Sequence, residues 1–406
     1  MKYVVILGDG MADHPLEQLD GKTPLQYANI PTIDDLAKHG ELGLVKTVPD
    51  QMPPGSDVAN LSVMGYNPFE FYSGRSPLEA ASMGVDLSES DITFRCNLVT
   101  LSNEKNYGER TIIDHSADEI STEEARQIMV DIHKHLHTEA IKFYPGISYR
   151  HLMVWHNGPC DFTLTPPHDI LEKKITDFLP QGPNGKIILD LMVKSSELLE
   201  NHPVNQKRLA KGLRPANSIW IWGEGKKPRL SSFKDKYKLS GSVISAVDLI
   251  KGLGICAGLN SIEVEGATGT IHTNFLGKAR AAIEALEQGQ DFVYVHLEAP
   301  DECGHRYEIQ NKVIAIERID ERIVKVIKGY LDTIEDDYKI MVLPDHATPL
   351  SLRTHTDEPV PFVIYQKNNI QHHPAQVYDE FSAKDTGIYF AEGHTLMDYF
   401  INHHRD

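Results

Sequence analysis

The chain has 406 residues, of which 41% are hydrophobic and 24% are charged, and its formal net charge is −18 at pH 7. This length can bury one large core, or one core and a second domain. So acidic a surface argues against nucleic-acid binding, and four scattered cysteines without a CxxC pair argue against a disulfide framework. No apolar run reaches the roughly 18 residues of a membrane span. We therefore expect a cytoplasmic protein without a nucleic-acid or membrane partner.

Three apolar runs are each followed by acidic or histidine residues. Residues 3–7 lead into GDG, residues 292–297 into EAPDECGH, and residues 340–343 into PDH. Such runs are typical of central parallel strands, and a doubly wound sheet binds its ligands beyond the carboxyl ends of these strands. Apolar residues at helical spacing predict helices over residues 243–253 and 313–327 between the strands.

The middle of the chain has a different pattern. Residues 121–137 and 187–200 are predicted to be helices and residues 148–155 a strand, with proline-rich loops between them. None of these elements ends in acidic and histidine residues like those at the two ends of the chain. We predict an inserted α+β domain at residues 111–229, within an α/β core formed by residues 1–110 and 230–406.

Acidic and histidine side chains cluster after the three predicted strands: Asp9, Asp301, His305, Asp345, His346 and His355. Taken singly, such an aspartate is usually a turn residue and such a histidine is usually hydrogen-bonded or exposed. Together they would converge at one edge of the sheet. Carboxylate and imidazole ligands suit Mn²⁺, with Zn²⁺, Mg²⁺ or Co²⁺ as alternatives. Six ligands exceed the need of one catalytic ion, so we expect two, as in phosphoryl transfer.

The stretch MPPGSDVANLSVMGY, residues 52–66, places Ser56 directly after prolines and a glycine, where a helix is predicted to begin. Taken alone, Ser56 is either a helix cap or a nucleophile. A GxxxxGK[ST] loop is absent from the sequence, which disfavours a kinase with its own nucleotide loop.

Several sequence words together resemble the archaeal-type branch of the cofactor-independent phosphoglycerate mutases, in the alkaline phosphatase superfamily. The words are GDGMAD, MPPGSDVANLSVMGY, GRSPLEA, FRCNLVT, PANSIWIWG, HLEAPDECGH and LPDHATP. The resemblance implies an alkaline-phosphatase-like, doubly wound, mostly parallel sheet, with the inserted domain acting as a lid. It also implies a glycolytic isomerase that needs no 2,3-bisphosphoglycerate and acts as a monomer or small homo-oligomer.

The resemblance further implies a role for each site residue. One ion would be held by Asp301, His305 and His355. The other would be held by Asp9, Asp345, His346 and the oxygen of Ser56. Ser56 would take the phosphoryl group of phosphoglycerate, forming phosphoserine, and glycerate would take it back on its other hydroxyl group.

Positive charge is concentrated between residues 207 and 229, and Arg150 lies on the strand before this segment. We predict that Arg150, Arg208 and Arg214 bind the substrate's carboxylate and phosphate, the alternative being a solvated basic loop. Residues 113–122 lack the arginine-rich word that the resembling branch carries there. Two alternative functions therefore stay open, a phosphotransferase acting on homoserine and a metal-dependent phosphatase. The intact ligand set disfavours a non-catalytic metal-binding protein.

Overall fold

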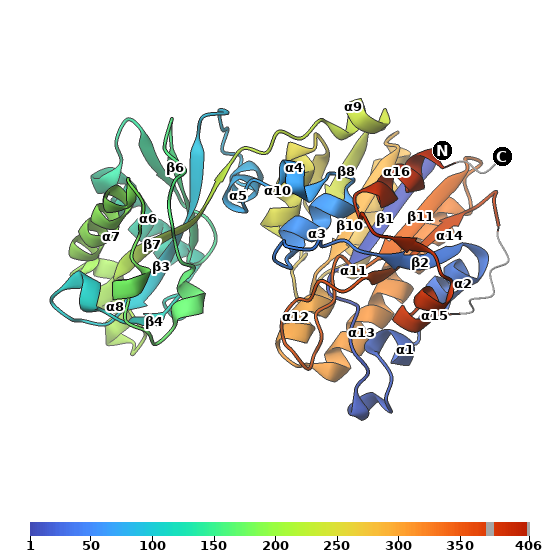
Figure 1. Cartoon of the computed structure of the whole chain (residues 1–406), viewed down its shortest axis with the longest axis horizontal. Coiled ribbons are helices and arrows are strands. Elements are labelled where there is room, and N and C mark those ends of the chain that lie inside the picture. Colours follow the sequence, from blue (N-terminus) through green and yellow to red (C-terminus); the bar gives the residue numbers. More distant parts are fainter. Residues whose placement is uncertain (371–376, 404–406) are drawn as a thin grey trace. The chain divides into compact units, whose positions relative to one another are not determined.

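The computed structural model, shown in Figure 1, describes residues 1–370 and 377–403. It divides into two compact units: unit 1 comprises residues 1–72 and 229–406, and unit 2 comprises residues 73–228. Unit 2 is thus an insertion, but it begins well before the predicted boundary at residues 110 and 111. The reason is strand β3 (Ile92–Leu101), which pairs with the strands of unit 2 rather than joining the sheet of unit 1.

Unit 1 is built on a sheet with the strand order β13-β2-β12-β11-β1-β10-β8-β9. Its strands are β1 (Lys2–Gly8), β2 (Glu41–Val45), β8 (Gly241–Ile244), β9 (Asn260–Ile262), β10 (Phe292–Leu297), β11 (Tyr338–Leu343), β12 (Val360–Gln366) and β13 (Tyr389–Phe390). Only β12 runs antiparallel to its neighbours β11 and β2 in this sheet, and the remaining pairings are parallel. The mostly parallel sheet confirms the predicted fold class, and β1, β10 and β11 confirm the three predicted strands.

Helices cover both faces of this sheet. The helices of unit 1 are α1 (Pro24–Tyr27), α2 (Pro31–His39), α3 (Ser56–Val63), α4 (Pro68–Phe71), α9 (Phe233–Tyr237), α10 (Asp248–Cys256), α11 (Phe275–Glu287), α12 (Ala299–His305), α13 (Ile309–Ile319), α14 (Lys325–Leu331), α15 (Glu380–Asp385) and α16 (Thr395–Asn402). On one face, α2, α11, α13 and α14 bury the apolar side chains of β1, β10 and β11. On the other face, the ring of Tyr3 packs edge-on against Phe400 of α16, and Tyr294 contacts α3. A strand buried on both faces is apolar along its whole length, which explains the continuous apolar runs of the sequence.

The helix predicted over residues 243–253 is wrong in its first half. Val243 and Ile244 belong to strand β8, where Val243 pairs with Tyr294 of β10, and helix α10 begins at Asp248. Adjacent apolar residues satisfy a helical pattern by spacing alone, and here the pairing with β10 decides the conformation. The helix predicted over residues 313–327 is confirmed by α13, a π-helical turn (Asp320–Val324) and α14.

Unit 2 is an α+β unit with an antiparallel sheet. Besides β3 it contains β4 (Ile112–Asp114), β5 (Ile141–Tyr144), β6 (Arg150–Trp155), β7 (Ser218–Lys226), α5 (Ser76–Ser82), α6 (Thr122–Leu136), α7 (Gly185–Leu199) and α8 (Pro203–Ala210). Its own apolar core includes Trp220, Phe94 and Met192. Within residues 1–370 and 377–403, no helix combines the length and apolar character needed to cross a membrane.

Candidate metal centre and nucleophile

Three aspartates lie beyond the carboxyl ends of three adjacent parallel strands. Asp9 follows β1, Asp345 follows β11, and Asp301 lies in α12, which begins just after β10. The turn after β1 needs Gly10, whose φ is +63° and whose Cβ, if present, would lie 2.8 Å from the Cα atom of Asp301. A residue with a side chain would therefore be strained and would push the aspartates apart.

Asp9, Asp345 and His346 form the first group of side chains that could hold a metal ion. Their ligand atoms all lie within 4.8 Å of one another, and all three residues are buried. Nε2 of His346 lies 3.6 Å from Oδ1 of Asp9 and 3.5 Å from Oδ2 of Asp345. The hydroxyl of Ser56 lies 3.1 Å from the same nitrogen. The three members of this group and the adjacent Ser56 are the four residues that the resemblance placed together.

The second group of potential ligands is formed by Asp301, His346 and His355, again within 4.8 Å of one another. Nε2 of His355 lies 3.3 Å from Oδ1 of Asp301, and Nε2 of His305 lies 3.3 Å from Oδ2 of the same carboxylate. The rings of His346 and His355 have centroids 4.0 Å apart. His346 therefore belongs to both groups, whereas the resemblance placed it with only one of them.

The electrostatics of Asp9 fit a cation at this edge of the sheet. Burial, followed by the charges of Asp345 and Asp301, raises the pKa of Asp9 well above its ordinary value. Oδ1 of Asp9 is buried and receives no hydrogen bond from the part of the chain that the structure describes. Buried carboxylates of like charge with an unused oxygen are costly unless a cation compensates them, so the donor set fits divalent metal ions.

Helix geometry tests the helix-cap interpretation of Ser56. Helix α3 begins at Ser56 itself, and the N-cap position is occupied by Gly55, so the hydroxyl of Ser56 does not cap the helix. It lies beside His346 instead. The helix-cap interpretation is therefore wrong. The nucleophile interpretation requires the hydroxyl to lie next to the metal ligands, and the hydroxyl does lie next to His346 of the first group.

Three buried residues contact the predicted ligands and were missed in the sequence. His296 in β10 lies with Nε2 3.0 Å from Oδ2 of Asp9, and its burial lowers its pKa to about 3. Thr348 donates a 2.5 Å hydrogen bond to Oδ1 of Asp301. Asn60 donates a 2.8 Å hydrogen bond to Oδ2 of Asp345. Each lies in one of the sequence words that also contain a predicted ligand or Ser56. This closeness in sequence was the one signal that could have pointed to them.

Two of the three arginines predicted to bind substrate are engaged within unit 2. Arg208 is only 2% exposed, and its Nε, Nη1 and Nη2 donate to the carbonyl of Arg214, to Glu124 and to the carbonyl of Ala117. Three of its five N–H donors are thus used within unit 2, and the role of Arg208 in substrate binding stays a prediction. Arg214 forms an ion pair of 3.0 Å with Asp114.

Arg150 is exposed, and its guanidinium lies over the ring of Tyr149, 5.1 Å from the centroid. A further arginine of unit 2, Arg95, was not singled out in the sequence. It lies 4.4 Å from the ring centroid of Trp222 and donates a 3.0 Å hydrogen bond to Glu79. Burial lowers the pKa of Arg95, and the positive charges of Arg75 and Arg150 lower it further.

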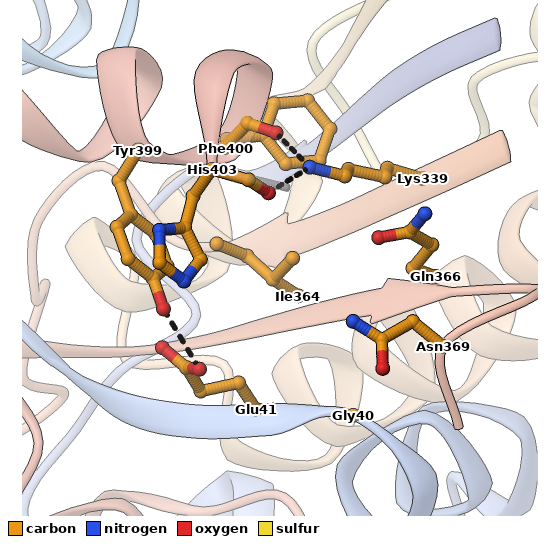
Figure 2. A pocket seen from close by; sticks show the side chains of 9 residues that line it. All are labelled: Gly40, Glu41, Lys339, Ile364, Gln366, Asn369, Tyr399, Phe400 and His403. Carbon is orange, nitrogen blue, oxygen red and sulfur yellow. Dashed lines mark hydrogen bonds between the residues drawn. The ribbon is translucent and has the colours of Figure 1, made fainter. Parts of the chain in front are cut away.

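The pocket drawn in Figure 2 lies at the amino ends of β2 and β11, opposite the edge that carries the aspartates. Its volume of about 40 Å³ suits ordered water rather than a phosphorylated acid. The cation that lines it, Lys339, already donates to the carbonyls of Phe400 and His403. The pocket therefore carries no candidate active site.

A doubly wound sheet with paired aspartate and histidine groups at its carboxyl edge, and a serine beside them, defines the metal-dependent enzymes of the alkaline phosphatase superfamily. Residues 37–205 match the family model of 2,3-bisphosphoglycerate-independent phosphoglycerate mutase. Residues 182–375 match that of type I phosphodiesterase / nucleotide pyrophosphatase.

Relatives that match nearly the whole chain specify the family. A probable 2,3-bisphosphoglycerate-independent phosphoglycerate mutase of Geobacter sulfurreducens is 50% identical over 402 residues, covering 99% of this chain and 100% of the relative. The mutase of Methanosarcina barkeri is 49% identical, with 99% of both chains covered. The chain belongs to the family of 2,3-bisphosphoglycerate-independent phosphoglycerate mutases, which are metal-dependent isomerases, and the resemblance seen in the sequence is confirmed.

Solved structures agree with this family. A protein of Pyrococcus horikoshii superposes with a TM-score of 0.82 at 30% identity, covering 99% of this chain and 96% of the other. The cofactor-independent phosphoglycerate mutase of Thermoplasma acidophilum superposes with a TM-score of 0.66 at 25% identity, covering 98% and 99% of the two chains.

Proposed function

We propose that the protein interconverts 3-phosphoglycerate and 2-phosphoglycerate through a phosphoserine at Ser56. The observation that carries this proposal is the contact of 3.1 Å between the hydroxyl of Ser56 and Nε2 of His346, the residue shared by the two groups of potential ligands. A serine at this position has its oxygen where the phosphoryl group of a bound substrate would be transferred.

Two divalent ions, most suitably Mn²⁺, complete the proposed site. Asp9, Asp345 and His346 would hold one of them with the oxygen of Ser56, and Asp301, His305 and His355 would hold the other. When bound, the ions lower the pKa of the serine hydroxyl and stabilise negative charge on the oxygens of the transferred phosphoryl group.

The chain's own residues carry the two transfer steps. The hydroxyl of Ser56 gives up its proton and its oxygen attacks phosphorus in line, the bond from phosphorus to the substrate oxygen breaks, and that oxygen takes up a proton to give glycerate. Glycerate stays bound and turns, its other hydroxyl gives up its proton and attacks the phosphoserine, and the oxygen of Ser56 takes up a proton as its bond to phosphorus breaks. The reaction needs no 2,3-bisphosphoglycerate, because Ser56 itself stores the phosphoryl group.

We further propose that unit 2 supplies the contacts to the substrate's carboxylate and acts as the lid that the sequence placed at residues 111–229. Arg150 is the best supported of the three predicted arginines, since its guanidinium is exposed and Arg95 adds a second positive charge beside it. The substrate is then a small phosphorylated acid. The proposal includes a cytoplasmic location and a monomer or small homo-oligomer.

The test is an assay of the purified, Mn²⁺-loaded protein with 3-phosphoglycerate, in which enolase converts the 2-phosphoglycerate formed. We expect turnover without added 2,3-bisphosphoglycerate, at a rate that is lost in EDTA and restored by Mn²⁺. Parallel reactions with ATP and homoserine, and with phosphoglycerate in the absence of enolase, detect phosphotransfer and phosphate release. Activity in either of these reactions, without mutase turnover, would overturn the proposal.

A further inference from the structure

Asn60 connects the helix that carries Ser56 with the aspartate after β11. It lies in α3, one helical turn after Ser56, and its side chain is fully buried. Its Nδ2 donates two hydrogen bonds of 2.8 Å, one to the carbonyl of Ser56 and one to Oδ2 of Asp345. One amide group therefore fixes both the backbone of the proposed nucleophile and an oxygen of a proposed ligand.

Tyr294 holds this amide in place from strand β10. It lies in β10, is fully buried, and donates a 2.6 Å hydrogen bond from its hydroxyl to Oδ1 of Asn60. Because the hydroxyl pairs with the oxygen side of the amide, the nitrogen side is directed to Asp345 and Ser56. All the polar atoms of the Asn60 side chain are thus used, which makes its orientation unique.

Resting on the proposed function, we propose that Asn60 and Tyr294 are positioning residues for the transfer at Ser56. Asn60 fixes the distance between α3 and Asp345, and Tyr294 fixes the orientation of Asn60. Neither side chain touches the reacting atoms. Their contribution is to hold Ser56 and Asp345 in the geometry that the ion and the phosphoryl group require, a role in which outer partners of metal ligands typically account for about 10–100-fold in metal affinity or activity.

The contacts explain why an amide is needed at residue 60. A carboxylate of the same shape has no hydrogen to donate and would place a further negative charge against the buried Asp345. An apolar side chain would leave Oδ2 of Asp345 without its donor. Sequence spacing alone gives no indication of this role, because Asn60 in an eight-residue helix could equally point to solvent.

The experiment compares Tyr294→Phe with Tyr378→Phe. Tyr378 is an equally buried tyrosine whose hydroxyl donates a 2.8 Å hydrogen bond to the carbonyl of Pro361, away from the aspartates. Both variants lose one buried hydroxyl and its hydrogen bond, so both are expected to lose similar stability. Four quantities are measured for each: the melting temperature, the Mn²⁺ affinity by calorimetry, and kcat and KM with 3-phosphoglycerate.

We expect Tyr294→Phe to lower Mn²⁺ affinity and kcat by about 10-fold, with KM changed by less than about 2-fold. Tyr378→Phe should keep the Mn²⁺ affinity and kcat near those of the wild type. Asn60→Leu, which keeps the shape of the side chain, should have the same effects as Tyr294→Phe or larger ones. The inference is overturned if Tyr294→Phe retains wild-type Mn²⁺ affinity and kcat, or if Tyr378→Phe loses them to the same extent.

The Mn²⁺ measurement also separates this inference from the proposed function, because it needs no substrate. A wild-type protein that binds Mn²⁺ but does not isomerise phosphoglycerate would refute the mutase proposal. In that case, lowered Mn²⁺ affinity in Tyr294→Phe alone would still support the positioning role, and unchanged affinity would refute it as well.

Discussion

Nε2 of His305 and Nε2 of His355 lie 2.9 Å apart, both within 3.3 Å of the carboxylate of Asp301. Two imidazole nitrogens this close share at most one proton. The hydrogen bond to Asp301 raises the pKa of His305 to about 9 in the metal-free protein, so this proton is present at neutral pH. An imidazole must lose its proton before it can bind a metal ion.

We therefore predict that Mn²⁺ binding at pH 7.5 releases about one proton from this pair, and that Mn²⁺ affinity rises with pH up to about 9. Calorimetric titration in two buffers with different ionisation enthalpies measures the release. His305→Gln should abolish it and weaken the pH dependence of binding. Equal binding enthalpies in both buffers would contradict the prediction.

Ser56→Ala should abolish isomerisation while leaving Mn²⁺ content close to that of the wild type, because only the nucleophilic oxygen is removed. The measurements are the enolase-coupled rate and the metal content of the purified variant. Ser62→Ala is the matched control: Ser62 lies in the same helix, and its hydroxyl is buried without a hydrogen-bond partner among the described residues. It should retain wild-type activity. An active Ser56→Ala variant would show that another group accepts the phosphoryl.

Glu380 should make stability depend on pH. Its Oε1 accepts from the amide of Asp13 and its Oε2 from the hydroxyl of Thr23, and burial raises its pKa from 4.5 to about 7. An acid whose pKa is raised in the folded state stabilises it fully below the unfolded pKa, and this contribution is lost as pH rises through about 7. The loss can reach about 3 kcal/mol.

The free energy of unfolding, measured in urea with EDTA present at pH 5.5 and pH 8.5, checks this prediction. The difference between the wild type and Glu380→Gln should shift in favour of the glutamine variant at the higher pH. A difference that does not change with pH would show that Glu380 titrates normally in the folded protein.

Lys312→Met should strongly destabilise unit 1. Nζ of Lys312 lies 2.6 Å from Oδ2 of Asp13, both side chains are fully buried, and Nζ also donates to the carbonyl of Thr348. Removing the cation leaves a buried carboxylate unpaired, which costs about 3–5 kcal/mol. Urea unfolding measures the loss. Arg306→Met, which breaks an exposed pair with Glu302, should change stability by about 1 kcal/mol or less.

Two arginine variants of unit 2 should behave in opposite ways. Arg150→Ala should raise KM for 3-phosphoglycerate about 10-fold or more and leave the melting temperature unchanged, because its guanidinium is exposed. Arg208→Ala should lower stability by about 2–4 kcal/mol, because it removes three buried donors, and leave KM unchanged at a temperature where the variant is folded. The reverse result would return the substrate-binding role to Arg208.

The sequence alone determined the core strands, the fold class, the family and the set of acidic and histidine side chains at the carboxyl edge. These features depend on residues that are adjacent in the sequence. An apolar run predicts a buried strand, and the residues directly after it must lie at the end of that strand. Tertiary structure decided the remainder. It made His346 a member of both groups of potential ligands, and it put Gly55 rather than Ser56 at the N-cap of α3. It also buried the guanidinium of Arg208 within unit 2.

It also decided where the chain divides and which residues support the site. β3 is as fully buried as β10 of the main sheet, and only its pairing with β6 and β7 puts it in unit 2. Asn60 and Tyr294 are separated by more than two hundred residues and meet only because α3 packs on β10. Hydrogen bonds of this kind depend on side-chain direction across packed elements, and local sequence does not encode that direction.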